Sequence, residues 1–140
     1  MSQLDSYLFF DGDCADAMRF YERTLGGKLE MLLKTSEGPP GAGCPGADPD
    51  AILHACVEIQ GRRLMASDWM GGEPYPGKSG FSLSVVYPTV AESRRIFDAL
   101  ADGGQVRMPL QQTFWVEAFG MLVDRYGTPW MVSGGRQANN

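Results

Sequence analysis

The sequence lacks the features that define several common classes of protein. No stretch reaches the roughly 18 consecutive apolar residues that a membrane span needs, and residues 1–5 lack the basic, apolar start of a secretory signal. The three cysteines form no Cys-x-x-Cys pair, and an odd number suits a reducing compartment better than a disulfide framework. We therefore expect a cytoplasmic protein with free thiols and no membrane partner.

Positive charge is also scarce. The chain has 12 Lys and Arg against 17 Asp and Glu, a formal net charge of −5, and its basic residues form no cluster. Such a balance repels phosphate backbones and anionic lipid, so we expect no nucleic-acid partner.

What the sequence does contain is typical of one globular domain spanning residues 1–140. Hydrophobic residues make up 44% and charged residues 21%, and a chain of 140 residues can bury a substantial core. The 18 glycines and nine prolines require many turns.

Each half of the chain predicts the same order of elements, which is strand, helix and three strands. The first half predicts strands over 4–10, 28–35, 52–59 and 62–68, with a helix that begins after Asp13 as its N-cap and ends at Gly26 and Gly27. The second half predicts strands over 81–87, 105–112, 114–124 and 129–134, with a helix that begins with the capping box of Thr89 and Glu92 and ends at Gly103 and Gly104.

A shift of 77 positions superimposes the two halves. It places Phe20 on Phe97, and Gly26 and Gly27 on Gly103 and Gly104. We therefore predict an α+β fold of two βαβββ modules, residues 1–69 and 79–135, whose curved sheets surround a cleft. Flexible loops are expected over 36–50 and 70–79 because these stretches are rich in glycine and proline.

Several motifs resemble those of the PhnB-like group of the vicinal-oxygen-chelate superfamily, which includes glyoxalase I, bleomycin-resistance proteins and extradiol dioxygenases. The most distinctive are Pro-Leu-Gln-Gln-Thr-Phe-Trp at 109–115 and Phe-Gly-Met-Leu-Val-Asp-Arg-Tyr-Gly at 119–127. The resemblance implies a homodimer with the glyoxalase/bleomycin resistance-like fold. Members often carry a demethylubiquinone methyltransferase label, but this chain has no glycine-rich strand-to-helix turn that would hold a methyl-donor nucleotide.

The metal ligands of the superfamily correspond approximately to Ser6, Ala66, Ser82 and Met131 in this sequence. Hydroxyl, methyl and thioether groups replace the imidazoles and carboxylates that hold zinc, nickel or ferrous iron. We therefore expect no metal and no other cofactor. The alternative is a metal-dependent enzyme of the glyoxalase or dioxygenase type that recruits His54, Asp68 and Glu117 from displaced positions.

The predicted ligand-binding residues are Ser82, Ser84, Gln111, Thr113, Trp115, His54 and Asp68. The two serines point the same way along an otherwise apolar strand, and buried hydroxyls need partners or water. Gln111, Thr113 and Trp115 should alternate on one side of a strand, as hydrogen-bonding groups beside a ring that covers the ligand.

His54 shares strand parity with Cys56 and Glu58, so it borders either the cleft or a sheet edge. Asp68 either accepts a ligand donor or caps a turn. Tyr7 either lends its hydroxyl to the cleft or, as the parity of Tyr7 and Phe9 opposite to Ser6 favours, packs with Phe9 against the first helix. Core positions are expected for Phe114, Phe119, Trp130 and Met131.

These residues favour a protein that binds a small organic molecule without a tightly held metal, and whether it also catalyses a reaction stays open. A third possibility is an interaction protein in which Trp115 forms a subunit contact.

Overall fold

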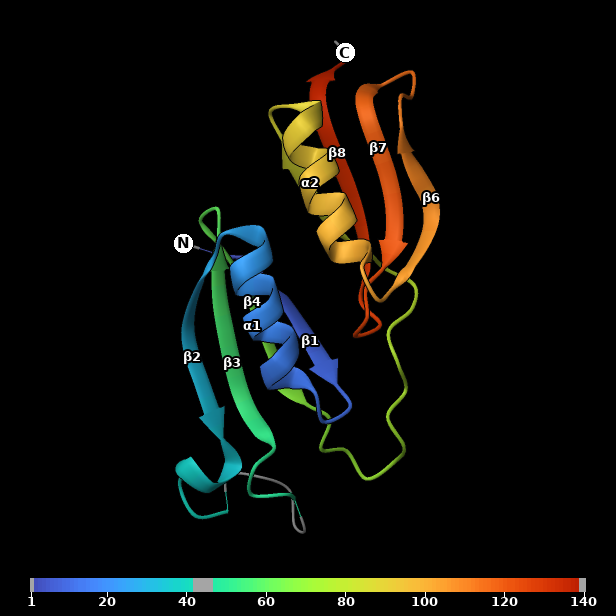
Figure 1. Cartoon of the computed structure of the whole chain (residues 1–140). Coiled ribbons are helices and arrows are strands. Elements are labelled where there is room, and N and C mark those ends of the chain that lie inside the picture. The colour runs from blue at the N-terminus through green and yellow to red at the C-terminus, as the bar shows by residue number, and fades with distance from the viewer. Residues whose placement is uncertain (1, 42–46, 139–140) are drawn as a thin grey trace. The chain divides into compact units, whose positions relative to one another are not determined.

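The computed structural model describes residues 2–41 and 47–138 (Figure 1). The chain divides into two compact units, Met1–Gly77, called unit 1, and Lys78–Asn140, called unit 2. Part of the predicted loop over 36–50, together with Cys44, lies outside the described residues. Each of the two α-helices has 12 residues, which is fewer than a bilayer crossing requires.

Unit 1 has the predicted order of one helix and four strands. Its elements are β1 (Ser6–Phe10), α1 (Cys14–Leu25), β2 (Lys28–Lys34), the short 3₁₀ helix η1 (Thr35–Glu37), β3 (Ile52–Ile59) and β4 (Arg62–Asp68). The strand order is β1-β4-β3-β2, with β1 parallel to β4 and the other pairs antiparallel.

Unit 2 repeats this arrangement, which confirms the predicted pair of βαβββ modules. Its elements are β5 (Leu83–Tyr87), α2 (Val90–Ala101), β6 (Gln105–Gln111), β7 (Val116–Val123) and β8 (Pro129–Gln137), and the strand order is β5-β8-β7-β6. Both β5 and β6 lie 77 positions after β1 and β2, so the shift read from the sequence applies residue by residue to these strands.

A single face of each sheet is covered by its helix. The predicted stripe of α1 is buried, including Cys14, Met18 and Tyr21, none of which has any exposed surface. On α2, Ile96, Phe97 and Leu100 are buried in the same way. These amphipathic faces explain why each helix packs on its own sheet.

The helix ends follow the predicted residues with one exception. The Thr89 hydroxyl accepts a hydrogen bond from the backbone N–H of Glu92 at 3.1 Å, as expected for a capping box. Gly26 ends α1 in the left-handed conformation, with φ of 72°. Asp13 occupies the N-cap position of α1, but its side chain makes no capping hydrogen bond; the carboxylate of Asp68 accepts from Cys14 N instead.

Sequence and structure agree fully at the hairpin between β3 and β4. Gln60 and Gly61 both have positive φ, 54° and 78°, the combination that a two-residue hairpin turn requires. The strands on either side begin and end at the predicted residues.

Candidate functional site

The strand register of unit 1 separates two faces of its sheet. Leu8 and Phe10 are 3% and 0% exposed on the face covered by α1, whereas Tyr7 and Phe9, which point the opposite way, are 41% and 44% exposed. The expectation that Tyr7 and Phe9 pack against the helix is therefore wrong, because the alternate residues of β1 fill that position. We call the face turned away from α1 the distal face.

An aromatic strip runs along the distal face of unit 1, from β3 through β1 to the segment after β4. It consists of His54, Tyr7, Phe9, Trp69 and Tyr75. Successive ring centroids are 5.6, 5.3, 5.5 and 6.5 Å apart, within or close to the range of favourable aromatic pairs. The strip is a continuous ring surface that presents two half-exposed side chains, Tyr7 and Phe9, at its centre.

A polar pair stands at one end of this strip. The hydroxyl of Tyr7 and Nδ1 of His54 share a hydrogen bond of 3.1 Å, and the direction of donation depends on the tautomer of the imidazole. His54 thus lies on the distal face with Cys56, as its strand parity predicts. The pair adds hydrogen-bonding capacity to an otherwise apolar surface.

At the other end, the segment after β4 is tied down by two side chains of the strip. The Tyr75 hydroxyl donates to the carbonyl oxygen of Phe9 at 2.7 Å, and Trp69 Nε1 donates to the carbonyl oxygen of Glu73 at 2.9 Å. Burial, with the charges of Asp13 and Asp11 as further causes, raises the pKa of Tyr75, so its hydroxyl remains a donor at neutral pH. The first part of the predicted loop over 70–79 is therefore anchored on unit 1.

A cavity of about 470 Å³ lies beside Trp69, within the size range of small-molecule sites. Carboxylates dominate its polar lining. The residues around it are Asp11, Gly12, Ala47, Asp48, Asp50, Ala51, Asp68, Trp69, Met70 and Gly71. Trp69 belongs to both the cavity wall and the aromatic strip, so the two features share this residue.

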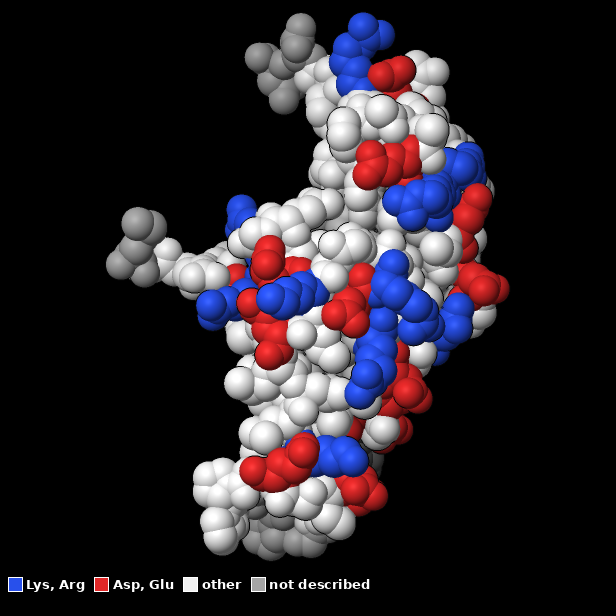
Figure 2. All heavy atoms as spheres, turned by 60° about the vertical axis from the view of Figure 1, so that its left-hand side comes forward, with Lys and Arg blue, Asp and Glu red and all other residues white. Residues whose placement is uncertain are grey.

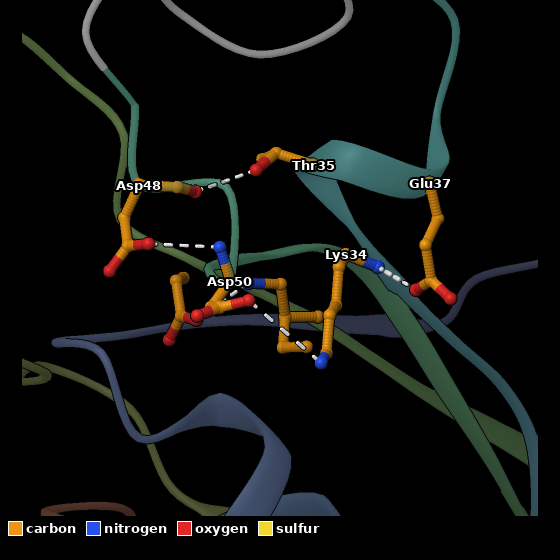
Figure 3. A network of polar contacts seen from close by, with 7 residues as sticks. Lys34, Thr35, Glu37, Asp48 and Asp50 are labelled. Atoms are coloured by element: carbon orange, nitrogen blue, oxygen red, sulfur yellow. Dashed lines mark hydrogen bonds and ion pairs between the residues drawn. The ribbon is translucent and has the colours of Figure 1, made fainter.

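The polar contacts at the rim of this cavity are shown in Figure 3. The carboxylate of Asp48 accepts from the backbone N–H of Asp50 at 2.9 Å, and the carboxylate of Asp50 lies 3.9 Å from the Lys34 ammonium. The Asp50 and Lys34 side chains are 81% and 50% exposed, so this ion pair is weak.

Asp68 is buried, with 4% of its surface exposed, and both carboxylate oxygens have backbone donors. Oδ1 accepts from Cys14 N at 3.0 Å and Oδ2 accepts from Ile52 N at 2.8 Å. Of the two roles predicted for Asp68, these contacts favour the structural one, because the side chain joins the starts of α1 and β3. Its negative charge still contributes to the cavity.

Neither described thiol has the surroundings of a nucleophile. Cys14 is fully buried and Cys56 is 8% exposed. Burial, reinforced by the charge of Glu30, raises the pKa of the Cys56 thiol, and Glu30 Oε1 lies 3.9 Å from its sulfur. A thiolate is therefore disfavoured at Cys56 near neutral pH.

The residues at the superfamily's metal positions do not fit a metal. Ser6 and Ala66 share the helix-covered side of the sheet with Leu8, so the neighbouring distal-face positions of β1 and β4 are Tyr7, Phe9, Met65 and Ser67 instead. Phenol, thioether and hydroxyl groups do not replace imidazole and carboxylate ligands. Within the described ranges, no group of three or more His, Cys, Asp or Glu residues could hold an ion.

The displaced ligand set of the metal-dependent alternative is also wrong. His54 is on the distal face, whereas Asp68 points to the α1 side and both its oxygens are engaged. Glu117, on β7 of unit 2, accepts the backbone N–H of Arg136 at 2.6 Å. Two of the three residues thus occupy opposite faces of one sheet and do not bind the same ion.

In unit 2, the two predicted serines are placed differently. Ser84 is exposed on β5 and lies opposite Met131 of β8, while Leu83 and Val85 turn toward the other face of the sheet. This alternation is the predicted one, although β5 begins at Leu83 and Ser82 therefore precedes the strand.

The predicted strand through Gln111, Thr113 and Trp115 is wrong. Strand β6 ends at Gln111 and β7 begins at Val116, so the other two residues lie in the turn between them. Thr113 closes this turn: its N–H donates to the carbonyl oxygen of Val116 at 3.1 Å, and its hydroxyl accepts from Val116 N at 3.3 Å. The chain reverses at residues 112–115, which interrupts the alternation of a strand.

The turn also changes the predicted placement of one aromatic residue, Phe114, whereas Phe119 lies in the core as predicted. Phe114 is 91% exposed rather than in the core, while Phe119 is 6% exposed and its ring lies 5.3 Å from that of Trp115. Trp130 is a core residue as predicted, at 2% exposure, whereas its neighbour Met131 is partly exposed.

These observations define the class of fold. Two units with the order βαβββ, each with a helix on one face of a mixed four-stranded sheet, are also found in a glyoxylase/bleomycin resistance protein/dioxygenase domain from Frankia sp. EAN1pec. That structure has a TM-score of 0.65 at 16% identity, with 97% of this chain and 99% of that chain covered. The chain thus has the fold of the glyoxalase/bleomycin resistance/dioxygenase superfamily.

The family follows from closer matches. Residues 2–133 match the model of the family described as 3-demethylubiquinone-9 3-methyltransferase, and the chain belongs to this PhnB-like family. It is 41% identical to protein YjdN of Escherichia coli K12, with 93% of each chain covered.

Solved structures agree with this assignment. The crystal structure of protein PA1353 from Pseudomonas aeruginosa has a TM-score of 0.89 at 41% identity, covering 96% of this chain and 98% of that one. A putative 3-demethylubiquinone-9 3-methyltransferase, PhnB protein, from Bacillus cereus has a TM-score of 0.80 at 24% identity, covering 96% and 100%. The predicted PhnB-like resemblance is confirmed.

Proposed function

We propose that this protein binds a small planar organic molecule on the distal face of unit 1, over the aromatic strip and beside the cavity, without a tightly held metal. The observation that carries the proposal is that Trp69 belongs to both features, which gives a ligand one apolar platform and one polar recess. Ligand sites typically combine aromatic walls with a few placed polar groups.

The residues of the site have distinct proposed roles. Phe9 and Tyr7 stack on the ligand, since they are the half-exposed rings of the strip. The Tyr7–His54 pair hydrogen-bonds a polar substituent at one end. The predicted ligand residues Ser82, Ser84, Gln111, Thr113 and Trp115 belong to unit 2, outside this site, and stay predictions.

A fragment screen followed by NMR tests this function. We expect planar fragments to shift the backbone amide signals of Tyr7, Phe9 and His54, and Phe9→Leu to weaken their binding about five- to tenfold, because leucine keeps apolar volume but has no ring face. Phe81→Leu is the matched control, since Phe81 has the same 44% exposure but lies in unit 2. Equal affinity of the Phe9→Leu variant and the unchanged protein would contradict the proposal.

We also propose a homodimer, as the family resemblance implies, with the turn over 112–115 as a contact. The supporting observation is that Phe114 is 91% exposed next to Trp115, which is 39% exposed, and solvent-exposed rings of this kind are enriched in protein interfaces. Sedimentation velocity should show a dimer. In the Phe114→Ser variant, we expect the dissociation constant of this dimer to rise at least tenfold. A dimer unaffected by Phe114→Ser and Trp115→Ala would exclude this contact.

A further inference from the structure

We propose that the ligand of the unit 1 site is a positively charged aromatic molecule, a planar ring system that carries a permanent or protonated cationic nitrogen. This inference rests on the proposed function and specifies its substrate class. It is carried by two independent features of unit 1: the half-exposed aromatic side chains of the strip, and the carboxylates around the cavity that shares Trp69 with it.

The ring faces favour a cation for an electrostatic reason. Aromatic faces carry partial negative charge, so a cation placed over Phe9 or Tyr7 is attracted to them, whereas an anion is repelled. A planar ligand stacks on the same rings in either case. Ring stacking therefore explains why a planar molecule binds. The sign of the ligand's charge then raises or lowers its affinity.

The excess of negative charge lies in unit 1, the unit that contains this site. Residues 1–77 contain 12 of the 17 acidic residues but only six of the 12 Lys and Arg side chains, whereas unit 2 is nearly balanced. Figure 2 shows acidic and basic side chains interleaved on the face drawn there, so the excess of negative charge is not spread as one large patch over that surface.

The carboxylates that line the cavity outnumber the basic side chains that pair with them. Asp11, Asp48, Asp50 and Asp68 line the cavity, and Lys34 is the basic group paired with one of them, at 3.9 Å from Asp50. The hydrogen bonds that Asp48 and Asp68 accept from backbone N–H groups do not neutralise their charge. Asp11, Asp48 and Asp50 are exposed, and several carboxylates around one recess attract cations from solution.

Basic residues near the other end of the strip are matched by acidic ones. Arg63 lies directly opposite Glu58 in the register of β3 and β4. The charges of Glu30, Arg63 and Asp5 all act on Cys56, two of them negative and one positive. Lys28 also lies opposite Glu58, in the register of β2 and β3, so acidic and basic groups are interleaved at this end of the strip and the carboxylates of the cavity carry the preference for a cation.

Three probes of similar ring size but different charge test the inference: N-methylquinolinium, neutral quinoline and the anion naphthalene-2-carboxylate. Each is titrated at pH 7.5 into the full chain by calorimetry and by amide NMR. We expect N-methylquinolinium to bind on the strip about tenfold more tightly than quinoline, and naphthalene-2-carboxylate more weakly than either. The advantage of the cation should decrease as salt is raised from 20 to 500 mM, concentrations chosen to vary screening.

Charge-removing variants separate the two features. Asp11→Asn combined with Asp48→Asn should reduce the N-methylquinolinium affinity at least threefold and leave quinoline binding unchanged. Phe9→Leu should weaken both probes. Asp98→Asn and Phe81→Leu, both in unit 2, are the matched controls and should change neither.

The outcomes distinguish the inference from the proposed function. Equal binding of quinoline and N-methylquinolinium at the strip would overturn the cation preference and leave the proposed function standing. Tighter binding of naphthalene-2-carboxylate, or shifts confined to unit 2, would also overturn it. If none of the three probes perturbs the strip, the cationic ligand class is wrong, and the fragment screen decides the proposed function separately.

Discussion

Asp68→Asn is expected to lower the free energy of unfolding by about 3 kcal/mol. The carboxylate accepts two backbone hydrogen bonds, whereas an amide has one accepting oxygen and one donating NH₂ group. The carboxylate accepts from Cys14 N at the start of α1 and from Ile52 N at the start of β3. An amide of the same shape accepts one of these bonds but turns its NH₂ group toward the other N–H. With Asp68 at 4% exposure, little water reaches the orphaned donor.

Denaturant unfolding followed by circular dichroism measures this loss, and hydrogen exchange locates it at the amides of Cys14 and Ile52. The matched control is Asp16→Asn, an exposed acidic residue in the first turn of α1, for which about 0.5 kcal/mol is expected from the helix dipole. A loss below 1 kcal/mol for Asp68→Asn would show that the carboxylate does not hold the junction, and would favour its alternative role as a ligand acceptor.

Asp124→Asn in unit 2 should cost about 3 kcal/mol for a related reason. Asp124 is 3% exposed and accepts three hydrogen bonds. Its Oδ1 accepts from Tyr126 N at 2.8 Å and Thr128 N at 3.1 Å, and Oδ2 accepts from Trp130 Nε1 at 2.8 Å. An asparagine that kept the two backbone bonds would place its NH₂ group against the indole N–H, leaving two buried donors face to face.

Trp130 fluorescence during denaturant unfolding reports on this site, because its indole is the third donor. Asp98→Asn serves as the control: its exposed carboxylate makes an i,i+4 ion pair with Arg94 at 3.7 Å, and its loss should cost less than about 0.5 kcal/mol. If Asp124→Asn unfolds at the same denaturant concentration as the unchanged protein, the assignment of this carboxylate as the organiser of the β7–β8 turn is wrong.

Most of the fold could be predicted because its signals are local. Apolar residues at helical spacing and glycines at turns are properties of neighbouring residues, so α1, the N-cap at Thr89 and the strands on either side of Gln60 and Gly61 follow from the sequence. The repeat at 77 positions then predicts that the βαβββ module occurs twice, which no single helix or strand indicates.

The candidate site was less predictable because it depends on which face of a strand the helix covers. An aromatic-rich strand such as β1 has apolar residues on both sides, and its parity alone gave the wrong face for Tyr7 and Phe9. The ring contacts of the strip link β3, β1 and the segment after β4, which are distant in sequence. The only signal available was the density of aromatic residues in 7–10.

The prediction for residues 111–115 failed because alternation of polar and aromatic residues is not unique to strands. Thr113 uses its hydroxyl to close a turn, as threonine and serine commonly do. The Trp115 ring then folds onto Phe119, a contact within the hairpin that no spacing rule anticipates.

The hydrogen bond from Tyr75 to Phe9 has a consequence for the solubility of the protein. β1 borders its sheet, and because carbonyl groups alternate in direction along a strand, the Phe9 carbonyl points away from β4 while that of Phe10 accepts from Trp69 N. An unpaired border strand is a template for aggregation between molecules. The phenol of Tyr75 occupies the Phe9 acceptor, so the same tether that completes the aromatic strip also covers part of this edge.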